Sequence, residues 1–414
     1  MRKTTNNILL LTIALTLSVT SCKNVKNENK LAAASVEKIV PENLKWSERM
    51  MLSEIERFPD ASLLDFRDAP KWSYTNGLVL SAGIKVYEET KNQKIYDYIY
   101  AFANDMIDST GTIKTYKFDN HNLDMIKSGD VLLYLYPKTK EERFLKAMET
   151  LEYQMETQPR TSDGGYWHKR IYPYQMWLDG LYMAEPFHIN YAQQYIKDDA
   201  KVQKIYNDVV LQFDLIQKHS SDKKTGLLYH GWDESKEQAW ANKETGTSEH
   251  FWSRAMGWYG MALVDVLDFL PESHPGHERL VGYLNQFSEA VTKVQDIDTG
   301  LWYQVLDQGT REGNYLEATG TSMFVYTFAK GVRKGYLSEK YLNVAKKGYE
   351  GLLNNLVSVD DNGIVNLNQC CAVAGLGGKP YRDGSYEYYV NEKIRSNDPK
   401  GTGPFIMASL ELNR

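Results

Sequence analysis

The chain has 414 residues, of which 42% are hydrophobic and 25% charged, and its formal net charge is −6. These proportions are typical of a globular protein and exclude a disordered, collagen-like or multi-span membrane chain. With 48 basic against 54 acidic residues there is no excess of positive charge, so we expect no nucleic-acid partner. Three cysteines are too few for a disulfide-stapled scaffold, while 29 tyrosines and 9 tryptophans suit either a carbohydrate surface or a large helical core.

The chain begins with a segment typical of protein export. Arg2 and Lys3 precede an apolar run too short to span a bilayer, and the run ends in VTSC at Cys22, which resembles a bacterial lipobox. We predict a lipoprotein signal peptide over residues 1–21 and a polar tether over residues 22–45. Cys22 would carry the lipid, and that anchor would be the membrane contact of a cell-envelope protein facing the periplasm or the cell surface. A plain secretory signal is the alternative.

Residues 46–414 contain an internal repeat. Similar short segments, each with a glycine followed by extended apolar and aromatic residues, recur around Gly111, Gly165, Gly226, Gly300 and Gly363. Glycine tolerates a positive φ, so each segment predicts a turn followed by a short extended stretch. The number of residues between successive glycine segments is enough for one pair of helices in each repeat.

Two kinds of predicted helix lie between these turns. One kind is amphipathic, and the other is apolar nearly all round, beginning near Asn76, Gly129, Asp179, Gly257, Gly320 and Gly403. A helix that is apolar all round must be buried among others, and an amphipathic helix covers it from outside. We therefore predict one all-α domain over residues 46–414, an (α/α)6 barrel with the glycine turns at one mouth. An open α-solenoid is the alternative.

Two carboxylates are candidates for catalysis at that mouth. Asp179 lies in the apolar sequence YPYQMWLDGLYMAEPF, where burial should raise its pKa toward the value that a general acid needs. Asp124, in HNLDMIKSGD, occupies the corresponding place one repeat earlier. Together they would form the acid pair of a glycosidase. The alternative for each is a helix cap or a turn residue.

Other polar side chains follow the same loops. His168 and His230 each come shortly after a repeat glycine, where they would either contact sugar hydroxyls or simply be packed. Arg254 precedes an apolar helix and is either a buried ion-pair partner or an anion binder, and Trp258 lies on the same helical face. Lys169 is a second candidate for a negative substrate. No metal-ligand spacing and no nucleotide-binding fingerprint is present, so we expect neither a metal nor a cofactor.

Four segments carry a family resemblance: YPYQMWLDGLYMAEPF, HGWDES, WSRAMGWYGMAL and RDGSYEYYVNEKIRSNDPKGTGPFIMASLEL. They resemble glycoside hydrolase family 105, the unsaturated rhamnogalacturonyl hydrolases, and more distantly the unsaturated glucuronyl hydrolases of family 88. The resemblance runs from about Trp46 to the C-terminus. It implies an (α/α)6 barrel and an oligosaccharide substrate with a 4,5-unsaturated uronic acid at its non-reducing end, as left by a polysaccharide lyase.

The resemblance also implies roles for single residues. Asp179 matches the catalytic acid/base and Asp124 the second acid. The positions that match the lining of the family's sugar site are Tyr74, His168, His230, Arg254 and Trp258. The implied reaction is hydration of the vinyl ether of an unsaturated galacturonic acid, after which the sugar leaving group is expelled. Two rivals remain: a two-carboxylate hydrolase of saturated glycosides, and a non-catalytic glycan-binding lipoprotein.

Overall fold

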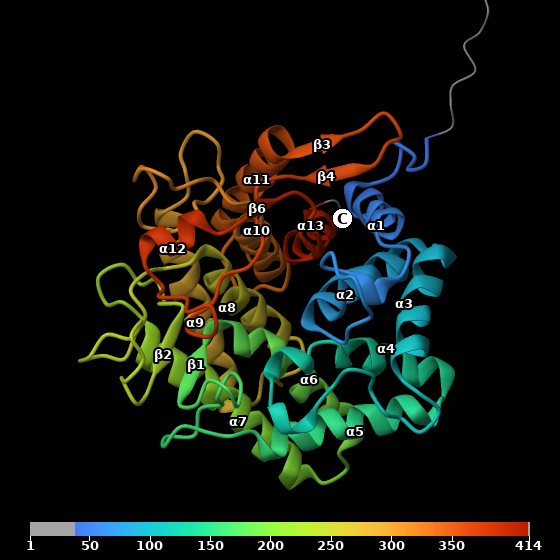
Figure 1. The fold of residues 1–414 in the computed structure, drawn as a ribbon, viewed down its shortest axis with the longest axis horizontal. Helices are drawn as coiled ribbons and strands as arrows, with labels where there is room; N and C mark the ends of the chain where they lie inside the picture. Colours follow the sequence, from blue (N-terminus) through green and yellow to red (C-terminus); the bar gives the residue numbers. More distant parts are fainter. Residues whose placement is uncertain (1–37, 413–414) are drawn as a thin grey trace, which may run out of the picture. The chain divides into compact units, whose positions relative to one another are not determined.

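Residues 38–412 are described in a computed structural model of the protein, and they form one compact, mostly helical unit (Figure 1). The inner helices are α2 (Tyr74–Thr90), α4 (Gly129–Thr139), α6 (Leu178–Tyr195), α8 (Ser253–Val266), α10 (Ala318–Arg333) and α13 (Pro399–Leu412). The outer helices are α1 (Trp46–Arg57), α3 (Gln93–Met106), α5 (Glu142–Thr157), α7 (Asp199–Ser220), α9 (Pro275–Lys293) and α11 (Lys340–Gly351). The predicted signal peptide, Cys22 and residues 22–37 of the predicted tether lie outside the described residues.

The inner helices form a closed ring. Each contacts the next along the sequence, and α13 completes the circle by packing against both α10 and α2. Figure 1 shows α13 between the orange α10 and the blue α2, with α1 beside it. Because α1 packs on α13, the sixth helical pair joins the first helix to the last. The predicted (α/α)6 barrel is therefore confirmed, and the chain does not form an open solenoid.

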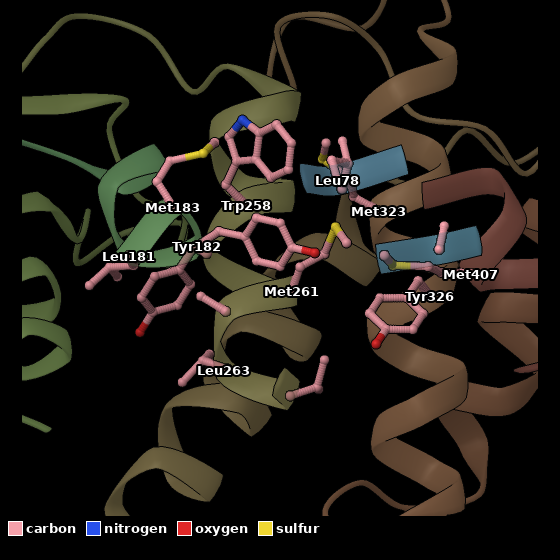
Figure 2. Packing of buried hydrophobic residues seen from close by; sticks show 14 of the residues in the cluster. Leu78, Leu181, Tyr182, Met183, Trp258, Met261, Leu263, Met323, Tyr326 and Met407 are labelled. Atoms are coloured by element: carbon pink, nitrogen blue, oxygen red, sulfur yellow. The ribbon is translucent and has the colours of Figure 1, made fainter. Parts of the chain in front are cut away.

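The apolar pattern of each helix matches its place in the barrel. Every residue of α8 is buried, whereas α3 buries one stripe with helical spacing and exposes its charged side chains. Aromatic and methionine side chains of the inner helices fill the barrel axis, as Figure 2 shows around Tyr182 and Trp258. These two rings stack with their centroids 5.1 Å apart. No helix within residues 38–412 is long and apolar enough to cross a bilayer.

The connections differ sharply between the two ends of the barrel. Each outer helix leads to the next inner helix through a long loop, whereas inner helices lead to outer ones through shorter connections. All the long loops therefore gather at the end where the inner helices begin. They contain three short antiparallel strand pairs, β1 (Gln175–Trp177) with β2 (Gly231–Asp233), β3 (Val357–Val359) with β4 (Val365–Leu367), and β5 (Cys370–Cys371) with β6 (Ile394–Arg395), and the short helix α12 (Tyr386–Asn391).

The repeat glycines form turns in these long loops. The φ angle is +91° at Gly111, +78° at Gly226, +75° at Gly300 and +85° at Gly363. In the second repeat the prediction of Gly165 was one residue out, because the positive φ, +102°, belongs to Gly164. Gly165 is required for a different reason: a Cβ there would lie 2.1 Å from Sδ of Met176.

Candidate active site

The short β1–β2 ladder holds one of the predicted acids against a histidine. Asp179 lies in the first turn of α6, directly after β1, and His230 directly precedes β2. The amide N–H of Leu178 donates to the carbonyl of His230 at 3.1 Å, which fixes the two segments side by side. Nε2 of His230 then lies 3.3 Å from Oδ2 of Asp179, and its Nδ1 lies 2.8 Å from the hydroxyl of Tyr389.

The second acid is held in the same manner one repeat earlier. Asp124 lies in the short 3₁₀ helix η3 (Leu123–Met125), and the amide N–H of Leu123 donates to the carbonyl of His168 at 3.2 Å. Oδ1 of Asp124 lies 3.4 Å from Nε2 of His168, and its Oδ2 lies 2.5 Å from Nζ of Lys169. The residue that caps η3 is Asn122, so the carboxylate of Asp124 does not serve as the cap.

The indole ring of Trp177 lies between the two acid–histidine pairs. It stacks on His168 with centroids 4.5 Å apart and an interplanar angle of 18°, and its edge meets His230 at 5.5 Å. Its Nε1 donates to Oε1 of Gln175 at 3.1 Å. The two acid–histidine pairs are therefore parts of one packed assembly, while the catalytic role of the two acids stays a prediction. The sequence analysis did not assign Trp177 a role, although its position two residues before Asp179 in an aromatic run was a usable signal.

The electrostatics of Asp179 correct one prediction. Burial does raise the pKa of its carboxyl group, but the contact and charge of His230 and the charge of His168 outweigh burial, so the pKa lies below its ordinary value. At rest, Asp179 is therefore a carboxylate and not the neutral acid expected from burial alone. Burial lowers the pKa of His168 to about 4, against the opposing charge of Asp124, so this ring is neutral near pH 7.

Arg254 is a buried cation beside this assembly. The residue is 1% exposed, and its Nη1 donates to the carbonyl oxygen of Cys371 at 2.5 Å. No carboxylate of residues 38–412 lies within the 4.0 Å of an ion pair, so the ion-pair alternative is not what the structure shows. The guanidinium lies over the ring of Trp252 at 4.6 Å, and that ring contacts His230 at 4.7 Å. Trp252, like Tyr389, was not predicted as a site residue.

Tyr74 and Trp258 share one wall of the site, but with different exposure. Their rings meet edge to face with centroids 6.3 Å apart. Trp258 is 1% exposed and is stacked on Tyr182 in the barrel core (Figure 2), whereas Tyr74 is partly exposed. Trp258 is therefore covered by neighbouring rings, as Arg254 is by its own surroundings, and its predicted place as a stacking wall stays a prediction. Tyr74 is the accessible ring of the pair.

Metal ligands and thiols are the other groups that could support chemistry. Within residues 38–412 no group of three or more His, Cys, Asp or Glu side chains is arranged to hold a metal ion. Cys370 and Cys371 are buried free thiols. Burial raises the pKa of the Cys371 thiol to about 11, which keeps it protonated and unreactive near pH 7.

A closed helical barrel with paired acids at its loop-bearing mouth is the architecture of a class of glycosidases. The sequence matches Glycosyl Hydrolase Family 88 over residues 46–414, and the chain belongs to this family of glycoside hydrolases. A solved glycoside hydrolase of family 105 from C. acetobutylicum is 45% identical, with a TM-score of 0.85, over 89% of this chain and 99% of that one. The predicted resemblance to family 105, with a more distant likeness to family 88, is confirmed.

Two other proteins are similar over most of the chain. The unsaturated rhamnogalacturonyl hydrolase YesR of Bacillus subtilis is 24% identical over 287 residues, covering 67% of this chain and 75% of that protein. The unsaturated glucuronyl hydrolase of Bacillus sp. GL1 shares the fold, with a TM-score of 0.63 at 13% identity over 89% of this chain and 95% of that one. The protein is thus a glycoside hydrolase with this barrel fold.

Proposed function

We propose that the protein removes a 4,5-unsaturated galacturonic acid from the non-reducing end of lyase-generated oligosaccharides such as rhamnogalacturonan fragments. Arg254 is the observation that carries this proposal. Arg254 is a buried guanidinium with no carboxylate of residues 38–412 at ion-pair distance, and the negative charges around it, those of Asp398 and Glu317, act from further away, so its fork is free to pair with the carboxylate of a ligand. A uronate supplies such a carboxylate, and the similarity to YesR supports the choice of sugar.

In the proposed reaction, the double bond is the group that is protonated. Asp179 delivers a proton to C4, and water adds at C5 as positive charge develops there, returning a proton to the Asp179 carboxylate. The resulting hemiketal opens to a ketone at C5, and the hemiacetal left at C1 expels the sugar alcohol. His230 holds the carboxyl of Asp179 in place, while Asp124, fixed by Lys169 and His168, binds substrate hydroxyls. No step requires a metal or an organic cofactor.

Because the pKa of Asp179 is low, we propose that substrate binding changes the protonation state of this residue. A carboxylate that is ionised at rest must gain a proton before it can act as an acid. An anionic uronate bound nearby disfavours the ionised form and raises the pKa of Asp179. On this proposal the reactive protonation state forms in the complex and not in the free enzyme.

The direct test is an assay of substrates. Purified protein is incubated with lyase-digested rhamnogalacturonan and, in parallel, with lyase-digested ulvan, and the ultraviolet absorbance of the conjugated double bond is followed. We expect that absorbance to be lost with the rhamnogalacturonan fragments as free sugar ends appear. Faster loss on ulvan fragments would move the assignment to the group of relatives named unsaturated 3S-rhamnoglycuronyl hydrolases. Cleavage of saturated uronides would contradict the hydration mechanism.

The role of Arg254 has a separate test. Arg254→Lys keeps the charge but loses the planar fork, so it should impair turnover of the unsaturated uronide. On a carboxyl-reduced, neutral substrate, the wild type and Arg254→Lys should be similarly poor, because both lack the same interaction. An unchanged relative defect on the neutral substrate would show that Arg254 only supports the carbonyl of Cys371.

We further propose that the protein is lipid-anchored in the cell envelope through Cys22, as the lipobox-like sequence predicts. Cys22→Ala should abolish incorporation of labelled fatty acid and release the protein from the membrane fraction. Membrane association that persists in Cys22→Ala would point to a different attachment.

A further inference from the structure

A second cavity opens at the end of the barrel opposite the long loops. Its volume is about 440 Å³, within the usual range of small-molecule sites of about 300–1,000 Å³. It is lined by the later turns of inner helices, including Lys85 of α2, Pro137 of α4, Gln194 of α6 and Asp265 of α8. The lining extends to Lys127 and Asp130 at the beginning of α4, but none of the residues that line the cavity is among the candidate active-site residues.

The charges in this cavity do not cancel. Asp130 pairs with Lys127 at 2.7 Å, and Asp265 pairs with Lys330 at 2.6 Å. Asp268 is bonded at 2.6 Å by Lys330 and also by Lys334. Each carboxylate of the lining is therefore already neutralised by lysine.

Lys85 is a cation of the lining that takes part in none of these ion pairs. It lines the same cavity, and no carboxylate of residues 38–412 lies within 4.0 Å of its ammonium group. Burial lowers the pKa of Lys85, with the charge of Lys330 acting in the same direction. One turn earlier on α2, Oγ of Ser81 lines the cavity as well, and it is buried without a hydrogen-bond partner. An ammonium without a carboxylate at ion-pair distance and a buried hydroxyl without a hydrogen-bond partner, four residues apart on one helix, suit one carboxylate.

Further polar groups indicate a hydroxylated ligand. Asn190 and Gln194, one turn apart on α6, line the cavity and are joined by a hydrogen bond of 2.6 Å, which leaves their other amide atoms for a ligand. Apolar side chains such as Ile84 and Phe269 face the same space and suit the apolar face of a sugar ring. We propose that this cavity is a binding site for a small sugar acid of monosaccharide size, with its carboxylate on Lys85 and Ser81. The site is separate from catalysis and does not depend on the proposed function.

The test uses Met407, which lines the cavity from α13, as a local reporter. NMR spectra of isotope-labelled methionine methyl groups are recorded while D-galacturonate or the neutral D-galactose is added, with Met407→Leu assigning the signal. We expect the Met407 signal to shift with galacturonate and not with galactose. The same response is expected in Asp179→Asn, since the reporter is remote from the mouth and a ligand there would move other signals.

Variants separate a carboxylate site from a general effect. Lys85→Leu should weaken galacturonate binding by roughly tenfold or more, because a hydrogen bond to a charged group is lost. Ser81→Val, which removes the hydroxyl, should also weaken it. Lys138→Leu is the matched control, since Lys138 lines the same cavity but already pairs with Glu88 at 3.2 Å, and should leave binding unchanged.

Three results would overturn the proposal. The first is a Met407 signal that galacturonate does not move, and the second is an equal shift with galactose. The third is wild-type affinity in both Lys85→Leu and Ser81→Val, each shown to be folded by a dispersed methyl spectrum. Because none of these readouts measures turnover, the proposal stands or falls independently of the enzymatic assignment.

Discussion

Asp179 illustrates how one contact changes what a buried carboxyl group does. Burial alone would make it a neutral acid, but the approach of His230 to 3.3 Å favours the carboxylate. The same residue can still be the acid of the reaction if substrate binding restores the proton. Sequence context gave the burial correctly and missed the histidine contact, because His230 reaches Asp179 only through pairing of two distant strands.

Asp179→Asn tests this role directly. The amide is nearly isosteric but donates no acidic proton, so turnover should fall by roughly 10²–10⁴-fold while thermal unfolding and sugar affinity stay unchanged. Asp298→Asn, in an exposed loop, serves as a control for loss of one negative charge. Activity of Asp179→Asn within about tenfold of wild type would remove Asp179 from the acid role.

His168 predicts a pH dependence of stability. Its folded pKa of about 4 lies below its ordinary 6.5, so between these values the unfolded chain binds a proton that the folded chain does not. The free energy of unfolding should therefore fall as the pH is lowered from 6.5 toward 4, with a contribution from this residue of about 3 kcal/mol.

Urea unfolding of the wild type and His168→Gln at pH 6.5 and pH 4.5 measures that contribution. The difference between the two pH values should be smaller in His168→Gln, because its side chain does not titrate. Protonation of Asp179 adds little in this window, since its pKa lies below the ordinary 3.8. An identical pH dependence in both proteins would show that His168 is not buried as a neutral ring.

At the scale of elements, the turns explain why glycine recurs at the mouth. Gly300 and Gly335 both have a positive φ, +75° and +78°, but they differ in surroundings. A Cβ on Gly300 would lie 2.6 Å from the carbonyl oxygen of Lys347, whereas one on Gly335 would meet nothing within 4 Å. The repeat glycine is therefore needed for both backbone conformation and space.

This pair of glycines gives a matched comparison. Gly335→Ala should cost about 1–2 kcal/mol, the usual penalty of a left-handed conformation. Gly300→Ala should cost clearly more, because the turn must also move away from the backbone of α11. Thermal unfolding midpoints of the two variants measure the difference, and equal losses would contradict the role given to close packing.

The helices were predictable from sequence in a way that the small sheets were not. Each inner helix has a nearly continuous apolar sequence, and that pattern alone locates the first turns of α2, α4, α6, α8, α10 and α13, although it stops well short of the end of α6. Strands β1 and β2 have three residues each, and helices α6 and α7 separate them in the chain. No local sequence pattern therefore predicts that they pair. The repeat suggested that Asp124 and Asp179 face one mouth and that His168 and His230 follow the same loops, but the acid–histidine contacts and the indole of Trp177 between them required the folded geometry.

At the scale of the whole molecule, closure of the ring determines which parts of the chain are dispensable. Helix α13 packs against α2, α10 and α1, and every one of its residues from Pro399 to Leu410 is buried. A chain ending at residue 398 would expose the apolar faces of three neighbouring helices. We expect such a truncation to be insoluble or rapidly digested by protease, whereas Leu412→Ala, at the partly buried end of α13, should fold. Soluble, protease-resistant protein from the truncated chain would contradict this dependence.

The same closure sets an order of events during synthesis. Helix α2 is synthesised early, and its apolar face is fully covered only after α13, the last inner helix, has been synthesised. Arg254 likewise lacks its hydrogen-bond acceptor, the carbonyl of Cys371, until that residue is synthesised more than a hundred positions later in the chain. The ring therefore cannot close before α13 has been synthesised, and the surroundings of Arg254 cannot be complete before Cys371 has been added to the chain.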